Sequence, residues 1–210
     1  MLERTRGESR RRWLRKYAVR LLANLLALSL LTILAWDLAA GRFFIDPAKE
    51  VTIRTGRLAV AFLLLSLACT PIFTFTGFGR ILQARRPLGL WAMVFAALHF
   101  LAFAGWDYRF DLAMLRIGIF AQPFVIVGLV AFLLLLVLGI TSIPALRGTM
   151  GRAWRPVQRL AYVTAALSVW HIVWAKKNPV EAWQYPIILV GLLLFRIPLL
   201  QQAIVRMRKR

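Results

Sequence analysis

Apolar segments of about twenty residues recur along the whole chain, and short basic segments separate them. Six such segments are evident, at residues 21–40, 58–75, 88–106, 120–140, 160–175 and 186–200. A helix of this length matches the hydrocarbon thickness of a membrane. Hydrophobic residues make up 60% of the 210 positions, and the mean hydropathy is +0.70, outside the soluble range. The sequence therefore predicts an all-α protein, a membrane bundle of six transmembrane helices.

Lys and Arg residues are unevenly distributed between alternate connecting segments. If the N-terminus is cytoplasmic, the segments on that side hold 8, 3, 4 and 5 of them, and the segments on the other side hold 4, 2 and 2. Translocated short loops are poor in Lys and Arg, so we expect both termini in the cytoplasm and a multi-pass protein of the bacterial inner membrane. The net charge of +20 then reflects topology and attraction to membrane lipid, and we expect no nucleic acid partner.

The predicted organisation is a single membrane domain with two basic ends. Residues 1–20 form a basic cytoplasmic segment without a small-residue cleavage site, so we interpret it as a retained anchor. Residues 21–200 form the six-helix domain, and residues 201–210 form a basic cytoplasmic tail. The single cysteine, Cys69, excludes an intramolecular disulfide, and no apolar segment has a charged residue near its centre. These features argue against a proton relay of buried carboxylates, and any chemistry must take place within or against the membrane.

The only two histidines, His99 and His171, both lie deep in apolar segments. Each lies eleven residues after the proposed start of its segment, and both segments run in the same direction across the membrane. Eleven residues of helix rise about 16 Å, so two parallel helices are expected to present imidazoles at the same depth. A neutral imidazole is a good ligand for haem iron, and a facing pair fills both axial positions, which suits electron transfer.

Residues around the histidines fit this hypothesis. Small side chains share a helix face with each histidine and could make room for a macrocycle, namely Ala92, Ala96 and Ala102 near His99, and Thr164 and Ser168 near His171. The aromatic residues Phe95, Phe103, Trp170 and Trp174 could pack on it, and the cationic residues Arg85, Arg86, Lys176 and Lys177 are candidates for contact with its propionates. A competing interpretation is that each histidine only bonds to a neighbouring helix.

Three stretches resemble a known family. They are "TGRLAVAFLLLSLACTPI" (residues 55–72), "RRPLGLWAMVFAALHF" (residues 85–100) and "WRPVQRLAYVTAALSVWHIVW" (residues 154–174). In order and spacing they resemble the MsrQ (YedZ) family, the haem-binding membrane subunits of the methionine sulfoxide reductase system and part of the ferric-reductase-like transmembrane group. The resemblance covers about residues 46–200.

The resemblance implies a cytochrome b that takes electrons from quinone or a flavin donor and passes them to a periplasmic, molybdenum-containing, MsrP-like enzyme. That partner repairs oxidised periplasmic proteins, so this chain would be an electron-transfer subunit rather than the catalytic one. His99 and His171 match two haem ligands of the family. The resemblance also implies flavin mononucleotide (FMN), to which we assign no residues.

One family ligand is missing. The other histidine of the family's fifth helix, thirteen positions before the outer one, corresponds to Gln158 here. Glutamine is a poor iron ligand, so we expect one haem b, bound by His99 and His171. Two alternatives remain open at this point: a stand-alone cytochrome that reduces ferric ion or oxygen, and a haem-free membrane scaffold or small transporter whose histidines only pack.

Overall fold

The structure is a computed structural model that describes residues 2–43, 45–176 and 179–208, and every regular element in these ranges is helical. In chain order the elements are α1 (Leu2–Ala39), α2 (Pro47–Thr76), η1 (Gly79–Ala84), α3 (Arg85–Ala102), η2 (Phe103–Asp107), α4 (Leu112–Ala121), α5 (Pro123–Ile140), α6 (Pro144–Met150), η3 (Gly151–Ala153), α7 (Trp154–Trp174), η4 (Pro179–Ala182), α8 (Gln184–Leu194) and α9 (Pro198–Arg208). The all-α fold predicted from the sequence is confirmed.

Helix ends follow local sequence signals. The side chain of Asp46 accepts a hydrogen bond from the backbone N–H of Lys49 at 3.0 Å and caps α2, whose first residue is Pro47. The same helix stops at Gly77, which adopts the left-handed conformation with φ 72°. Asp111 caps α4 in a similar way, through the N–H groups of Ala113 and Met114. Capping aspartates, a proline and a glycine in the left-handed conformation thus mark the ends of these apolar helices.

Four helical stretches in the described residues are long and apolar enough to cross a membrane, namely Tyr17–Ala39, Pro47–Thr76, Gly79–Asp107 and Pro123–Ile140. The bent pair α8 and α9 would make a fifth if the two count as one span. The 21-residue helix α7 does not qualify, because polar residues such as Gln158, Arg159 and His171 lower its hydropathy. The molecule is therefore a membrane protein, and the full count of six spans stays a prediction.

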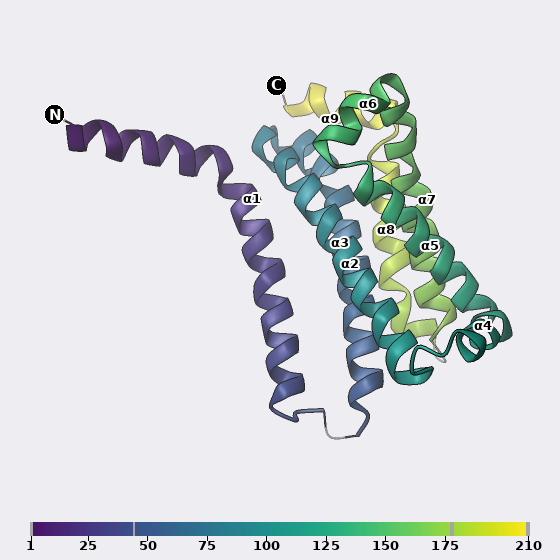
Figure 1. Cartoon of the computed structure of the whole chain (residues 1–210). Helices are drawn as coiled ribbons and strands as arrows, with labels where there is room; N and C mark the ends of the chain where they lie inside the picture. The colour runs from purple at the N-terminus through teal and green to yellow at the C-terminus, as the bar shows by residue number, and fades with distance from the viewer. Residues whose placement is uncertain (1, 44, 177–178, 209–210) are drawn as a thin grey trace.

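The bundle is built around α2 (Figure 1). Over half of its apolar window, 56%, is buried inside the molecule, compared with 17% for α1, 28% for α3 and 22% for α5. Helix α2 packs along α3, and α5 packs along α7. Phe62 of α2 and Phe95 of α3 are fully buried, with ring centroids 5.2 Å apart. These two pairs form the most extensive helix–helix packing of the fold, whereas α1 is packed less closely.

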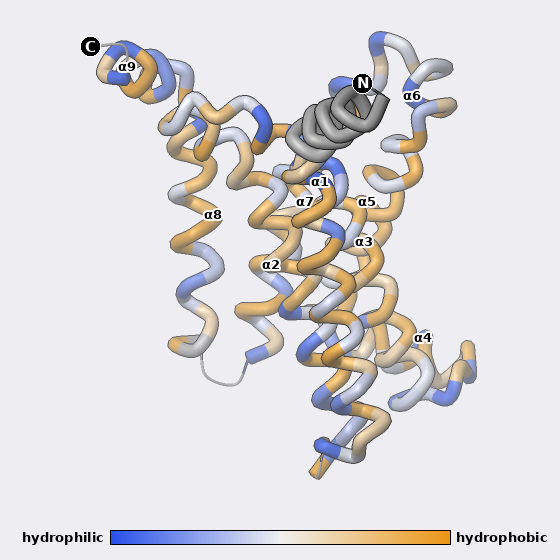
Figure 2. The backbone as a smooth tube through the Cα atoms, turned by 90° about the vertical axis from the view of Figure 1, so that its left-hand side faces the viewer, coloured by the Kyte–Doolittle hydropathy of each residue, from blue (hydrophilic) through white to orange (hydrophobic). Residues whose placement is uncertain are grey.

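The start of α1, α6 and α9 lie toward one end of the bundle, and α4 lies at the other (Figure 1). Figure 2 shows hydrophobic residues along the middle of the long helices and hydrophilic residues toward both ends. The described parts of the basic segments that were predicted to share one side of the membrane lie toward one end of the molecule, which we call the basic end. At the opposite end, Asp37 pairs with Arg42 at 3.0 Å and with Arg54 at 3.2 Å.

The fourth predicted segment begins later in the structure than the sequence indicated. Residues 120 and 121 end the separate helix α4, the chain is extended at Gln122, and α5 starts at Pro123. Proline has no N–H and disfavours helix at the residue before it, which favours a break between the two helices at this point. Hydropathy does not register this break, because α4 and α5 are both apolar.

The sixth predicted segment, residues 186–200, is divided. Helices α8 and α9 are bent by 74° relative to one another, and α9 starts at Pro198. Arg196 in the break does not reach toward solvent as a snorkelling side chain would. Its guanidinium donates to the Tyr162 hydroxyl and, at 2.7 Å, to the carbonyl of Leu67. That carbonyl has no helical partner, because the residue four positions later is Pro71.

Candidate functional site

His99 and His171 meet in the interior of the bundle. His99 is three residues before the end of α3, and His171 is three residues before the end of α7. The centroids of the two rings are 6.1 Å apart, and the ring planes are inclined by 76°. The prediction that two helices present these side chains at one depth is confirmed.

Both imidazoles are held by the same kind of contact. Nδ1 of His99 lies 2.7 Å from the carbonyl oxygen of Thr52 in α2, and Nδ1 of His171 lies 2.7 Å from that of Phe124 in α5. A carbonyl oxygen only accepts hydrogen bonds, so Nδ1 carries the proton in each ring. In the neutral imidazole Nε2 then has a free lone pair. A hydrogen bond of this kind orients a histidine as a metal ligand.

A glycine faces each histidine from the neighbouring helix. A Cβ atom at Gly56 would lie 2.9 Å from Nδ1 of His99, and one at Gly128 would lie 2.7 Å from Nδ1 of His171. Both distances are shorter than van der Waals contact allows. The glycines lie four residues after the carbonyls of Thr52 and Phe124, on the same helix face. Each imidazole thus rests in a notch that only glycine provides.

The separation of the rings is suited to one metal ion between them. A metal–imidazole bond is about 2 Å long, so a metal ligated from opposite sides by two imidazoles holds their centroids roughly 6 Å apart. In the described parts of the chain, no three His, Cys, Asp or Glu side chains gather to hold a metal on their own. A pair of imidazoles therefore suits a metal whose other ligands come from a macrocycle, and these residues fit haem iron.

Among the small residues predicted near the histidines, Ala92 and Thr164 are fully buried, with no exposed surface. The predicted aromatic residues have other neighbours. The Phe95 ring packs on Phe62 and Trp91 in the core. The Trp170 and Trp174 rings stack on one another, and 57% and 48% of these residues is exposed, so they face outward. The aromatic ring beside His171 is instead Phe124, with centroids 5.9 Å apart.

The structure does not bring Arg85 and Arg86 together with the histidines. They begin α3, fourteen and thirteen residues before His99, and a helix of that length rises about 20 Å. The two arginines therefore lie at the basic end, whereas the histidines lie toward the other end. Of the two predicted lysines, Lys176 lies five residues after His171 and is half-buried. Lys177 lies outside the described residues.

Two comparisons with known proteins agree with the resemblance. A family model described as "Ferric reductase like transmembrane component" matches residues 55–169. A Klebsiella pneumoniae protein named "Protein-methionine-sulfoxide reductase heme-binding subunit MsrQ" is 32% identical over 168 residues, which cover 78% of this chain and 82% of the relative. The chain belongs to the MsrQ family. A relative of the same name from Enterobacter sp. is also 32% identical over 168 residues, which cover 78% of this chain and 83% of that relative.

Gln158, for which the resemblance implied a histidine in the family, lies thirteen residues before His171 along α7. Its side-chain amide donates to the hydroxyl of Thr141 at 2.9 Å and to the carbonyl of Leu138 at 3.3 Å. The residue therefore ties α7 to the end of α5. This contact accounts for a half-buried polar side chain at that position without a cofactor.

Sequence reasoning did not single out Gly56, Gly128 or the two carbonyls, although a signal for them exists in this MsrQ-family chain. Each histidine lies 47 residues after its carbonyl and 43 residues after its glycine (52, 56 and 99; 124, 128 and 171). The carbonyl, glycine and histidine of the second set each lie 72 positions after their counterparts in the first set. A search for equal spacings before the two histidines would have found both glycines.

Proposed function

We propose that this chain is a haem b membrane subunit that transfers electrons, with His99 and His171 as the axial ligands. The observation that carries the proposal is the adjacent pair of imidazoles, with ring centroids 6.1 Å apart, each fixed through Nδ1 to a backbone carbonyl. The relatives' printed name, a heme-binding subunit, supports the same cofactor. The chain has only two histidines, so we expect one haem per chain.

The chain's own residues would bind and orient the cofactor rather than act on a substrate. The carbonyls of Thr52 and Phe124 keep the Nδ1 atoms protonated, and Gly56 and Gly128 admit the rings. A haem held by His99 and His171 would supply one-electron oxidation and reduction.

For the topology, we propose six spans, α1, α2, α3, α5, α7 and the α8–α9 pair, in the bacterial inner membrane with both termini cytoplasmic. The shared basic end supports this orientation. The histidine pair then lies nearer the periplasmic side, where electrons would leave the chain. The organisation into residues 1–20, 21–200 and 201–210 stays part of the proposal.

The proposed acceptor is a periplasmic, MsrP-like molybdenum enzyme that reduces methionine sulfoxide in oxidised proteins, and the proposed donor is quinone or a flavin reductase. The relatives' name, a subunit of a protein-methionine-sulfoxide reductase, supports a catalytic partner of this kind. FMN stays a family-based proposal without assigned residues. The match to a ferric-reductase-like model favours one second candidate, a stand-alone cytochrome that reduces ferric ion or oxygen.

The first test is spectroscopic. Purified protein should show a b-type reduced-minus-oxidised spectrum with about one haem per chain, and His99→Ala and His171→Ala should each abolish it. Trp170→Ala is a matched control, because its exposed side chain lies next to His171 in sequence but faces outward. Full haem content in both histidine variants would refute the ligand assignment.

The second test separates the two candidate acceptors. The chemically reduced protein is mixed with an MsrP-like enzyme and methionine sulfoxide, with ferric citrate, or with oxygenated buffer, and its re-oxidation is followed. We expect rapid re-oxidation only with the enzyme and its substrate together. Equally rapid re-oxidation by ferric citrate or oxygen alone would favour the stand-alone reductase.

A further inference from the structure

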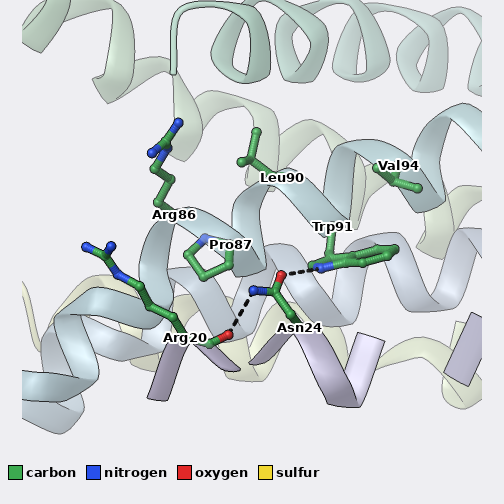
Figure 3. A pocket seen from close by; sticks show the side chains of 7 residues that line it. All are labelled: Arg20, Asn24, Arg86, Pro87, Leu90, Trp91 and Val94. Carbon is green, nitrogen blue, oxygen red and sulfur yellow. Dashed lines mark hydrogen bonds between the residues drawn. The ribbon is translucent and has the colours of Figure 1, made fainter. Parts of the chain in front are cut away.

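A second site lies at the basic end, between α1 and α3. A pocket of about 380 Å³ opens there, lined by Arg20, Asn24, Arg86, Pro87, Leu90, Trp91 and Val94. It lies at the opposite end of α3 from His99, so the haem proposal makes no use of it. Figure 3 shows the lining side chains, which come from α1 on one wall and α3 on the other.

Two cations mark one end of the pocket. Arg20 of α1 and Arg86 of α3 both lie at that end, on either side of Pro87 (Figure 3). Among residues with described side chains, the three ion pairs are made by Asp37 and Glu50 with Arg42 and Arg54, at the other end of the molecule. The Arg20 guanidinium also lies over the Tyr17 ring, with 5.8 Å between the guanidinium carbon and the ring centroid. The two positively charged guanidinium groups are thus suited to bind an anion. Among those described side chains, no carboxylate forms an ion pair with either of them.

The rest of the pocket is apolar, apart from one polar link. The side-chain oxygen of Asn24 accepts a hydrogen bond from the Trp91 indole at 2.9 Å, and its amide donates to the Arg20 carbonyl at 2.9 Å. These bonds satisfy the amide and the indole within the protein (Figure 3). Beyond them, Leu90 and Val94 continue the wall along α3, away from the arginines. The pocket therefore presents charge at one end and hydrocarbon at the other.

The depth of these residues in the bundle agrees with a lipid. Arg86 is in the first turn of α3, and Arg20 is three residues after Tyr17, where the apolar part of α1 begins. This is the level at which phospholipid headgroups meet the hydrocarbon core. Helix α1 is poorly packed, with 17% of its apolar window buried and Leu22 and Leu25 over 60% exposed. Protein contacts therefore hold α1 only weakly near the pocket, and a molecule seated between α1 and α3 would add contacts between the two helices.

We propose that this pocket binds an anionic phospholipid. Arg20 and Arg86 hold the phosphodiester through charge-assisted hydrogen bonds, and the first part of an acyl chain lies along Leu90, Trp91 and Val94. The bound lipid joins α1 to the bundle at the basic end. Basic pockets between membrane helices on the cytoplasmic side recognise anionic headgroups by this chemistry.

Native mass spectrometry of delipidated, detergent-solubilised protein tests the proposal without reference to haem. Equal amounts of phosphatidylglycerol or phosphatidylcholine are added back to the wild type and to the double variant Arg20→Gln/Arg86→Gln. We expect the wild type to retain phosphatidylglycerol, and the double variant to retain it about tenfold or more weakly, because two charge-assisted contacts are lost. The matched control, Arg80→Gln/Arg152→Gln, removes two exposed arginines of the same end that do not line the pocket, and should behave as the wild type.

Three results would overturn the proposal. They are equal retention of phosphatidylglycerol by the double variant, equal retention of phosphatidylcholine by the wild type, and complete displacement of the lipid by sodium phosphate, which would identify a site for a small anion. Circular dichroism checks that each variant is folded. If the double variant does not fold, Val94→Trp, which fills the apolar part and keeps both arginines, should also lose the lipid, and undiminished retention would refute the proposal.

Discussion

The helix pairs α2–α3 and α5–α7 are alike where they hold the histidines and differ at the basic end. Toward the histidine end, each pair combines a histidine, a carbonyl 47 residues earlier and a glycine 43 residues earlier. At the basic end, the first pair has Pro71 with the Arg196 contact and the second has Gln158 bonded to Thr141. The residue 72 positions before Gln158 is Arg86, so neither pair offers an imidazole there. The comparison explains why the chain can build one two-histidine site and no second one.

The glycines provide the strongest test of the likeness between the pairs. Gly128→Ala should remove most of the bound haem, because the new Cβ atom would lie 2.7 Å from two atoms of the His171 ring and displace it from its carbonyl. Gly56→Ala should act in the same direction but less strongly, since its closest contact with His99 is 2.9 Å. Haem content per chain and the reduced-minus-oxidised spectrum measure both effects.

Gly191→Ala in α8 is the matched control for the glycine variants. No atom lies within 4 Å of the Cβ position at Gly191, and alanine favours a helix over glycine by about 1 kcal/mol. We expect normal haem content and equal or higher stability. Unchanged haem content in Gly128→Ala would show that the glycine in α5 is not needed to position His171. The equal spacings in the two helix pairs would then have no role in haem binding.

Arg196 tests a difference between the pairs, because α5 has no internal proline that frees a carbonyl. Arg196→Met should lower the free energy of unfolding by about 1–3 kcal/mol, since the Leu67 carbonyl loses its donor in an apolar setting. Thermal unfolding in detergent measures the loss, and Arg152→Met, at an exposed position, serves as control.

A double-mutant cycle checks the cause of the Arg196 effect. In a Pro71→Ala background, the substituted residue supplies a backbone N–H to the Leu67 carbonyl, so Arg196→Met should cost less than it does in the wild type. Equal costs in the two backgrounds would mean that Arg196 stabilises the break between α8 and α9 through Tyr162 alone.

Gln158→Ala should have the smallest effect of the set. The substitution removes the contacts with Thr141 and Leu138 and should lower the free energy of unfolding by about 1 kcal/mol. Haem content should stay at the wild-type level, because Gln158 touches neither histidine. A loss of haem in this variant would instead identify the basic end as part of a cofactor site.

The histidine pair could be predicted from the sequence because its signal is local. The apolar segments at residues 88–106 and 160–175 lie within or overlap α3 and α7, and counting residues from the start of each segment places His99 and His171 at one depth. The aromatic partners could not be predicted in this way. Trp170 and Trp174 are close to His171 in sequence, yet they face outward, whereas Phe124 lies 47 residues away and contacts it. Sequence proximity on a helix gives depth but not direction toward a partner helix.

Breaks within apolar stretches were also beyond hydropathy. The separation of α4 from α5 at Gln122 and the 74° bend at residues 195–197 occur where both flanking helices carry apolar residues. Proline marks both places, at Pro123 and Pro198, but a proline is also accommodated inside α2 at Pro71. Whether a proline ends a helix depends on whether another part of the chain satisfies the freed carbonyl, as Arg196 does for Leu67.

The sequence by itself determined the class of the protein, the approximate positions of its apolar helices, the basic end and the two imidazoles that can ligate a metal. These features follow from composition and from period along one helix, which are local properties. Only the tertiary structure decided which carbonyls orient the histidines, which glycines admit them, and that Arg20 and Arg86 face one pocket far from the histidine pair. Those relations join residues that are distant in the sequence, 47 positions apart for each histidine and its carbonyl, and packing between helices alone determines them.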